Sequence, residues 1–393
     1  MSRTLVPVAA LGALACFAPA GAAPAPAPAV SGGQTNYFMG ASTSTGMDPT
    51  AGRPSPAAMM SMMAGGGLGG GGATRSLKLK LGSTRTANPA DASHTPPPGL
   101  KMAVLPLLPP LRSDPGKETG GLLGETQGKV KIYWGCGEKA GPGQPLVIDL
   151  AAPAANARLL GEGLKPAWQP SVTTHARYVD WPNRTTRSQK VGGSLPGEHA
   201  VAGQNLPDIR FTLSQTQDFL PPLNITGKAA TAAGALRLTW APVSGARAYY
   251  ATLVGSSEGE NNVIMWTSSA AGPIVAMAPD YMAQDEITRQ IGRKALLPAS
   301  ANECQIPREV AKAVPAGMLN IVAYGGEANF AQPRPAGAKP TWKPDWTAKV
   351  LYRSSAGSML GMDDADEGEE GKPGGKKGGL GRELLKGLMP FGG

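Results

Sequence analysis

Short runs of alternating apolar and polar residues dominate the middle of the chain. They carry β-branched and aromatic residues and are separated by Gly, Pro and Asn, which is typical of β-strands. Strands are predicted at residues 129–134, 145–150, 208–213, 236–240, 246–254, 263–268, 274–278, 319–324 and 347–352. This close spacing, with few helical stretches between the strands, favours a mainly β fold built from small β-sandwiches.

One stretch has a helical period instead. Ile287, Ile291 and Ala295 recur at every fourth position between residues 279 and 295, with acidic residues early and basic residues late, as the helix dipole favours. A second short helix is predicted at residues 307–313. Both helices would belong to one helical insert, residues 279–313.

The large aromatic residues mark the part of the chain that folds, because they contribute most of the buried area in small domains. All seven Trp lie between Trp134 and Trp346. We therefore expect two small domains, a β-rich domain at residues 129–218 and a β-sandwich with the helical insert at residues 219–354.

The two flanks of this span are of low complexity and are predicted to be disordered. Residues 23–128 are rich in Ala, Pro, Gly and Met and would form a tether, in which only residues 76–81 alternate as a short strand would. Residues 355–393 form a charged, Gly-rich tail that ends in a short amphipathic helix. This helix offers a peripheral contact to a membrane or a partner through Leu380, Leu384, Leu385 and Leu388.

Residues 236–249 read LRLTWAPVSGARAY and resemble the second and third strands of fibronectin type III domains. The resemblance implies an immunoglobulin-like β-sandwich in which Trp240 is a core ring, Tyr249 lies on the neighbouring strand and residues 320–324 form a late strand. The helical insert and the lack of a tyrosine corner before the late strand depart from that family. Residues 132–138 (IYWGCGE) also resemble a family of uncharacterised exported proteobacterial proteins, which implies no activity.

Residues 1–22 have the three parts of a cleavable secretory signal peptide. Arg3 gives a positive start, residues 5–17 are uncharged and rich in Ala, Leu and Val, and small residues precede the cleavage point before Ala23. We expect a periplasmic or secreted bacterial protein. Lipid anchoring through Cys16 is the alternative, since the residues before it resemble a loose version of the bacterial lipobox.

The net charge of +9 is spread along the chain rather than gathered into clusters. Nucleic-acid binders concentrate such charge on one face, so no nucleic-acid partner is predicted. A mildly basic surface favours anionic envelope polymers or lipid headgroups, or serves solubility alone. No stretch of about 18 apolar residues follows the signal, so no transmembrane span is predicted.

Two cysteines, Cys136 and Cys304, remain after cleavage of the signal. An even number of cysteines in an oxidising compartment favours a disulfide between them. Two buried free thiols are the alternative.

The best candidate for ligand contact is an aromatic pair near the last predicted strand. Trp342 and Trp346 lie close in sequence to Lys349 and Arg353, and such a set suits sugar rings or an anionic polymer. The alternative for Trp346 is a place in the core. A copper-binding protein is a further hypothesis, because thioether sulfur suits Cu(I) and four methionines cluster in the tether: Met59, Met60, Met62 and Met63.

Signals for catalysis are weak. Residues 255–259 (GSSEG) match the Gly-x-Ser-x-Gly pattern of hydrolases, but a turn follows instead of a helix, and the last histidine, His199, precedes the serine. The three histidines lack metal-ligand spacing, and the Gly-rich stretches lack a flanking strand and helix, so no metal or cofactor is predicted.

The sequence therefore predicts an exported, non-enzymatic protein of the cell envelope that acts as a binding or scaffolding module. Its partner would be an envelope protein or a polysaccharide. The alternative is an enzyme without a recognisable motif that uses carboxylates such as Asp180 or Asp149.

Overall fold

The computed structural model describes residues 35–46, 72–84, 92–110, 128–149, 163–186, 190–256, 262–274 and 278–361. Several predicted features lie outside these residues: the signal peptide at residues 1–22, the methionine cluster at residues 59–63, the strand at residues 274–278 in its central part, and the terminal leucines of the tail.

The described residues form a mainly β fold, as predicted. Its strands are β1 (Thr35–Gly46), β2 (Thr74–Ser83), β3 (Ala92–Thr95), β4 (Leu105–Leu107), β5 (Lys129–Trp134), β6 (Leu146–Asp149), β7 (Arg177–Trp181), β8 (Gly197–Gly203), β9 (Ile209–Leu213), β10 (Ile225–Ala230), β11 (Leu236–Trp240), β12 (Ala248–Ser256), β13 (Asn262–Thr267), β14 (Leu297–Pro298), β15 (Glu303–Ile306), β16 (Gly317–Ala331) and β17 (Trp346–Leu360). The helical elements are a 3-10 turn at Pro98–Leu100 and the helices α3 (Gln284–Gly292) and α4 (Arg308–Ala313). No helix among the described residues is long and apolar enough to cross a membrane.

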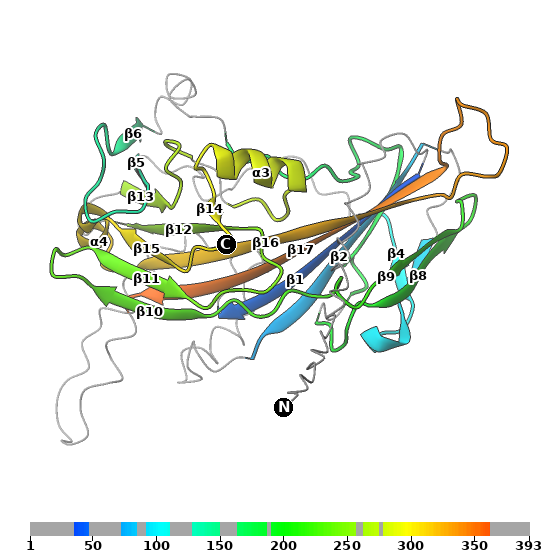
Figure 1. Cartoon of the computed structure of the whole chain (residues 1–393), viewed down its shortest axis with the longest axis horizontal. Coiled ribbons are helices and arrows are strands. Elements are labelled where there is room, and N and C mark those ends of the chain that lie inside the picture. Colours follow the sequence, from blue (N-terminus) through cyan, green and yellow to red (C-terminus); the bar gives the residue numbers. More distant parts are fainter. Residues whose placement is uncertain are drawn as a thin grey trace, which may run out of the picture.

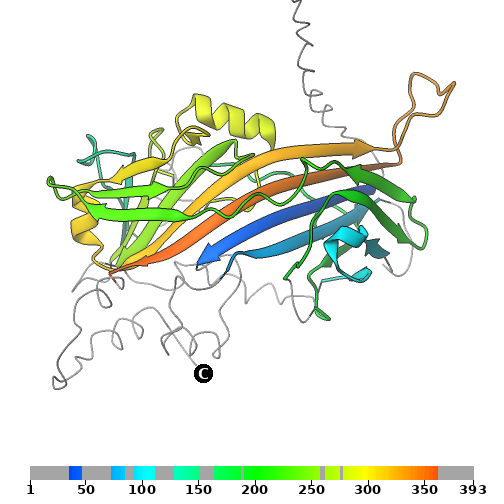
Figure 2. The same cartoon turned by 60° about the horizontal axis from the view of Figure 1, so that its bottom comes forward.

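One twisted sheet of ten strands runs the length of the molecule (Figure 1). Its strands follow the order β6-β5-β13-β12-β16-β17-β1-β2-β7, with β14 paired to β12. The two longest strands, β16 and β17, have 15 residues each and extend along most of this sheet (Figure 2). They connect the two ends of the molecule into one continuous layer.

Strand β1 lies inside this sheet, third from the β7 edge, between β17 and β2. It pairs in parallel with β17, from Thr35 opposite Trp346 to Gly46 opposite Gly357. Strands β1 to β4 all fall within residues 23–128, so the prediction of a disordered tether is wrong for these parts of that range. The prediction failed because the average composition of the range is low in large apolar residues, whereas the strands themselves bury Tyr37, Met39 and three leucines of β2.

A three-stranded sheet, β10-β11-β15, covers the inner face of the large sheet at one end. Trp240 of β11 lies 5.5 Å from the ring of Tyr249 of β12, and both side chains are buried in the main hydrophobic cluster. The face of β12 and β16 that points away from this sheet is covered by α3, whose Ile287 packs against Tyr250 and Val322.

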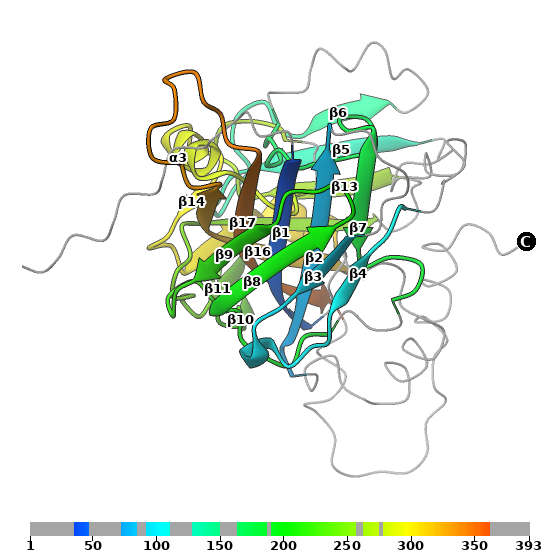
Figure 3. The same cartoon turned by 90° about the vertical axis from the view of Figure 1, so that its right-hand side faces the viewer.

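A four-stranded sheet, β4-β3-β8-β9, folds over the other end of the large sheet (Figure 3). An isolated bridge between Leu108 and Asp180 connects β7 to the chain that leaves β4, and β9 lies against β17. Between the two sheets the main hydrophobic cluster continues, with Leu79, Val201 and Phe211 in its interior.

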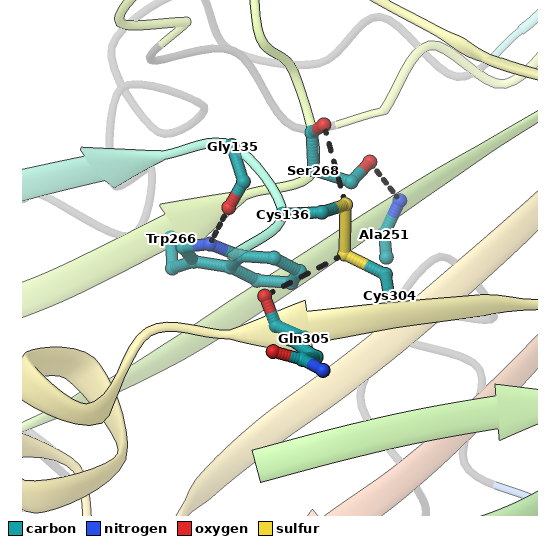
Figure 4. The surroundings of a disulfide bond; sticks show 7 residues. All are labelled: Gly135, Cys136, Ala251, Trp266, Ser268, Cys304 and Gln305. Atoms are coloured by element: carbon teal, nitrogen blue, oxygen red, sulfur yellow. Dashed lines mark hydrogen bonds between the residues drawn. A yellow bond between two sulfur atoms is a disulfide. The ribbon is translucent and has the colours of Figure 1, made fainter. Parts of the chain in front are cut away.

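The predicted disulfide between Cys136 and Cys304 is present, with the two Cα atoms 5.2 Å apart. It joins the residue that follows β5 to a residue of β15, so it fastens the large sheet to the three-stranded sheet (Figure 4). Trp266 packs beside it and donates a hydrogen bond from Nε1 to the carbonyl of Gly135, at 2.9 Å.

The expected count of two domains is not confirmed. Strand β5, expected in a first domain, pairs in parallel with β13 of the expected second domain. Strand β7 pairs with β2, and β8 and β9 belong to the four-stranded sheet. Residues 129–218 therefore contribute strands to separate parts of one connected arrangement.

Candidate functional site

The four residues proposed from the sequence as a ligand surface do not share one face. Trp346 opens β17 and is only 5% exposed in the main hydrophobic cluster. Side chains alternate along a strand, so Lys349 and Arg353 point to the opposite face from Trp346. Trp342 lies in the loop before β17 and is partly exposed.

Lys349 and Arg353 are instead part of a polar outer face of the large sheet. Lys349 Nζ lies 3.9 Å from a carboxylate oxygen of Glu327, and Arg353 Nη1 lies 3.5 Å from Asp280 Oδ1. Lys78 of β2 reaches the other oxygen of Asp280 at 2.5 Å. Positive side chains from β2 and β17 thus converge on one carboxylate above this face.

Residues 163–175 form a strap that crosses the same face. Its backbone is tied down at Lys165, whose N–H donates to Glu286 Oε1 at 3.2 Å, and at Ala167, whose N–H donates to the carbonyl of Tyr281 at 2.8 Å. At its far end His175 lies over Gly82 of β2, where a Cβ would come within 2.6 Å of the imidazole. The strap is therefore held at one end by α3 and the segment before it, and at the other end it lies over β2.

Trp168 is the most prominent side chain of this strap. It is 56% exposed, although most Trp side chains of a folded protein are largely buried. Its ring lies 5.9 Å from that of His175, and the hydroxyls of Ser171, Thr173 and Thr174 form a small hydrogen-bonded turn beside it. The imidazole in turn faces the amide of Asn36, with 3.2 Å between Nε2 and Nδ2.

A tyrosine–carboxylate pair continues this surface on β7. Tyr178 stands opposite Gly82 in the strand register, and its hydroxyl donates to Asp180 Oδ2 at 3.0 Å. Partial burial raises the pKa of Asp180, and the bond from Tyr178 and the charge of Lys80 offset this only in part. Burial, together with the neighbouring carboxylate, raises the pKa of Tyr178. We call Trp168, His175, Tyr178, Asp180 and Lys80 the strap surface.

Trp168 was not predicted as a site residue, although its sequence context carries a signal. Trp168 stands between Pro166 and Pro170, and prolines on both sides exclude it from the interior of a regular strand or helix. A Trp in such a loop has no strand partner to bury it. That pattern favours an exposed ring.

Two histidines that are far apart in the sequence lie in contact in the interior of the protein. His94 of β3 and His199 of β8 are fully buried, and their imidazoles are hydrogen-bonded at 3.1 Å between Nε2 and Nδ1. Tyr37 of β1 bonds to the other nitrogen of His94 at 2.8 Å. His94 was missed because its strand lies in the range taken for a tether.

The described residues bring together few groups suited to catalysis. Asp149 lies in β6 and Asp180 in β7, which are the opposite edges of the large sheet, so they do not form a carboxylate pair. No group of three or more His, Cys, Asp or Glu among these residues is placed to hold a metal ion. A shallow depression of about 400 Å³ over β3, β4 and β8 is lined by Ala92, Ser93, Pro106, Leu108, Ala202 and Gly203, none of which is ionisable.

Comparison with known proteins gives no match for this chain, whether with family models, with curated proteins or with solved structures. The contacts, burial and charges of the strap surface and of the buried histidine pair are therefore the basis for assigning a function.

Proposed function

We propose that this protein is an exported, non-enzymatic binding protein of the bacterial cell envelope and that it holds a polysaccharide at the strap surface. The observation that carries the proposal is the exposed ring of Trp168, which stands on a segment tied to Tyr281 and, through His175, to Asn36 of β1. A preorganised aromatic side chain loses little conformational entropy on binding, which favours affinity.

Export is supported by the disulfide between Cys136 and Cys304. Disulfides persist in oxidising compartments and are rare in the cytosol. The signal-like residues 1–22 support the same location, which is the periplasm or the extracellular medium.

A polysaccharide suits the strap surface better than a protein partner. The exposed large hydrophobic side chains among the described residues are Val104, Val147, Trp168 and Val172, and only the last two share a segment. A stable protein interface buries on the order of 1,600 Å² around several apolar anchors, which this surface lacks. One aromatic ring beside the hydroxyls of Ser171, Thr173 and Thr174 matches a sugar, which has an apolar ring face and a hydrogen-bonding edge.

We also propose that residues 219–354 include a fibronectin type III-like module. The arrangement of β10-β11-β15 against β13-β12-β16-β17 supports this, since it gives a sandwich of three and four strands. The packing of Trp240 against Tyr249 agrees with the core positions that the resemblance implies. Such a module is a scaffold, and the ligand contact comes from the strap, which begins beside α3 and extends to β2, outside the module.

The test is a titration of the purified, disulfide-bonded protein with soluble peptidoglycan fragments, and with dextran as a neutral glycan, followed by calorimetry. We expect Trp168→Ala to weaken binding at least tenfold, because the ring is the main apolar contact. Trp342→Ala, a partly exposed Trp outside the strap surface, is the matched control and should bind as the unmodified protein does. Binding that is equal in both variants, or absent for both glycans, would overturn the proposal.

A further inference from the structure

The buried contact between Tyr37, His94 and His199 connects three strands of two different sheets. Tyr37 lies on β1 of the large sheet, while His94 and His199 lie on the adjacent strands β3 and β8 of the four-stranded sheet. The hydrogen bonds measure 2.8 Å from Tyr37 to His94 and 3.1 Å from His94 to His199. At the far end, His199 Nε2 lies 2.8 Å from the carbonyl oxygen of Leu195.

The carbonyl at the end of this chain fixes the position of every proton in it. A carbonyl oxygen can only accept, so His199 Nε2 carries a proton and its Nδ1 is left to accept. His94 Nε2 must then donate to His199, and His94 Nδ1 must accept from the hydroxyl of Tyr37. The hydroxyl of Tyr37, the two imidazoles and the carbonyl of Leu195 all have hydrogen-bond partners only when both imidazoles are neutral.

Within the part of the chain that the structure describes, no neighbouring group offers a counter-charge to an imidazolium. Phe211 of β9 stacks on His199 at 5.2 Å with nearly parallel rings, and it also lies 6.0 Å from Tyr37. Glu198 and Arg210, on the same two strands, are exposed and paired with each other. The carboxylate of Asp218 accepts hydrogen bonds from the hydroxyl of Ser194 and from the N–H of Leu195. Among the described residues, the titratable groups that act on the pair are therefore Tyr37 and the two histidines themselves. Arg177 of β7 is also buried, but its guanidinium donates to the carbonyl of Gln204, beyond the end of β8.

An added proton has no position in this chain that leaves every group satisfied. If it arrives on His199 Nδ1, His94 must turn its proton towards Tyr37, whose own O–H then loses its acceptor. If it arrives on His94 Nδ1, the hydroxyl oxygen of Tyr37 must accept from that nitrogen, and the Tyr37 O–H again loses its acceptor. In both cases a positive charge is buried among aromatic rings, which is costly. Burial, and then the neighbouring His199, lower the pKa of His94 to about 3. Burial lowers the pKa of His199 as well, against the opposing effect of the Leu195 carbonyl.

We propose that Tyr37, His94 and His199 form an acid-sensitive latch that holds the four-stranded sheet on the large sheet at neutral pH and releases it when the histidines become protonated. The released state exposes both imidazoles to water, where they can carry charge. It also uncovers the aromatic core around Phe211, which packs on Phe330 of β16 in the closed state. This device is separate from the strap surface, which lies on the outer face.

The direction of the pH effect follows from the lowered pKa values. The closed state binds fewer protons than the open state, so closure is fully stable above the ordinary histidine pKa of about 6.5 and weakens as the pH falls below it. Between pH 7 and pH 5, the opening constant should rise roughly 25-fold if one histidine becomes charged on opening, and several hundredfold if both do.

Hydrogen exchange of the full, disulfide-bonded protein tests this, read as protection factors so that the intrinsic pH dependence of exchange is removed. A small sheet that has lost its packing frays, so peptides that cover β3 and β8 should lose at least tenfold protection between pH 7 and pH 5. Peptides that cover β12 and β16, which belong to the large sheet, should lose less than threefold. Equal losses in both regions, or unchanged protection in β3 and β8, would overturn the proposal.

The three histidines of the chain provide the matched variants. The double variant His94→Gln and His199→Gln should lose the pH dependence of exchange in β3 and β8, whereas His175→Gln should keep it. Because the double variant removes buried bonds, a second measurement uses the unmodified protein. Imidazole NMR signals of two histidines should stay neutral to below pH 5 while β3 and β8 remain protected, and ordinary titration near pH 6.5 in the closed state would refute the latch.

Discussion

Gly40 of β1 lies directly beneath the ring of Tyr281, so closely that a Cβ on Gly40 would come within 2.4 Å of the ring carbon Cζ. Tyr281 belongs to the segment that precedes α3, and its ring also contacts Phe38 and the guanidinium of Arg353. The absent side chain at position 40 therefore allows this segment, and with it the strap, to lie flat on the sheet.

Replacing Gly40 with alanine should destabilise the protein by about 1–3 kcal/mol, because the methyl group forces Tyr281 out of its position. Urea unfolding followed by circular dichroism measures this. Gly192→Ala is the matched control, since a Cβ there would meet no atom within 4 Å. In a Tyr281→Ala background the same Gly40 substitution should cost much less, and an equal cost in both backgrounds would contradict the steric explanation.

Removal of the disulfide should be costly because Cys136 and Cys304 are separated by 168 residues. A crosslink over such a long loop restricts the unfolded chain strongly, so the double variant Cys136→Ala and Cys304→Ala should lose about 2–5 kcal/mol of unfolding free energy. Guanidinium unfolding with and without a reductant provides the measurement. The reductant should lower the unfolding free energy of the unmodified protein and leave that of the double variant unchanged. If the reductant changes the unfolding free energy of neither protein, a structural disulfide is ruled out.

Local sequence patterns predicted some of the strands to the residue. The predicted limits of β5, at residues 129–134, and of β11, at residues 236–240, are those of the structure. In β11 and in the first four residues of β5, the alternation of apolar and polar side chains matches the two faces of the strand. The predicted helix was right in its centre, since α3 covers Gln284–Gly292, although it was predicted to begin earlier and end later.

Strand β1 shows why other parts could not be predicted in this way. Its second half buries Ser42 and Thr43, which look like loop residues in the sequence. Their hydroxyls are satisfied by distant groups, because Ser42 bonds to Ser76 and Thr43 donates to the carbonyl of Leu220. The parallel pairing of β1 with β17 also joins residues more than 300 positions apart, which no local pattern reveals.

The functional sites were predicted poorly for a related reason, which is that the contacts in them depend on strand order. Trp346 and Arg353 are close in sequence but lie on opposite faces of β17, so their proximity did not produce one surface. His94 and His199 are far apart in sequence but adjacent in space, because β3 and β8 are neighbouring strands. Functional geometry in a sheet of this kind depends on strand order, and the sequence alone does not specify that order.

Asp280 offers a test of the outer face that is independent of the disulfide and of the histidines. Burial alone would raise the pKa of this carboxyl, but Lys78, Arg353 and Lys80 outweigh burial and hold the pKa below its ordinary value. Asp280→Asn should therefore lower the unfolding free energy at pH 7 by about 1–3 kcal/mol, since it leaves the buried guanidinium of Arg353 with less compensation. Glu303→Gln, which removes the exposed pair with Arg237, is the matched control and should change it by less than about 1 kcal/mol.

The pH dependence of the Asp280 variant distinguishes charge from packing. A carboxyl with a lowered folded pKa stabilises the protein above its ordinary pKa of about 4, and this contribution is lost as the pH falls through the folded value. The unmodified protein and the Asp280→Asn variant should therefore differ most near pH 7 and converge as the pH falls below about 4. Chemical denaturation at a series of pH values measures the difference, and a gap that stays constant down to pH 3 would show that the effect of Asp280 is steric rather than electrostatic.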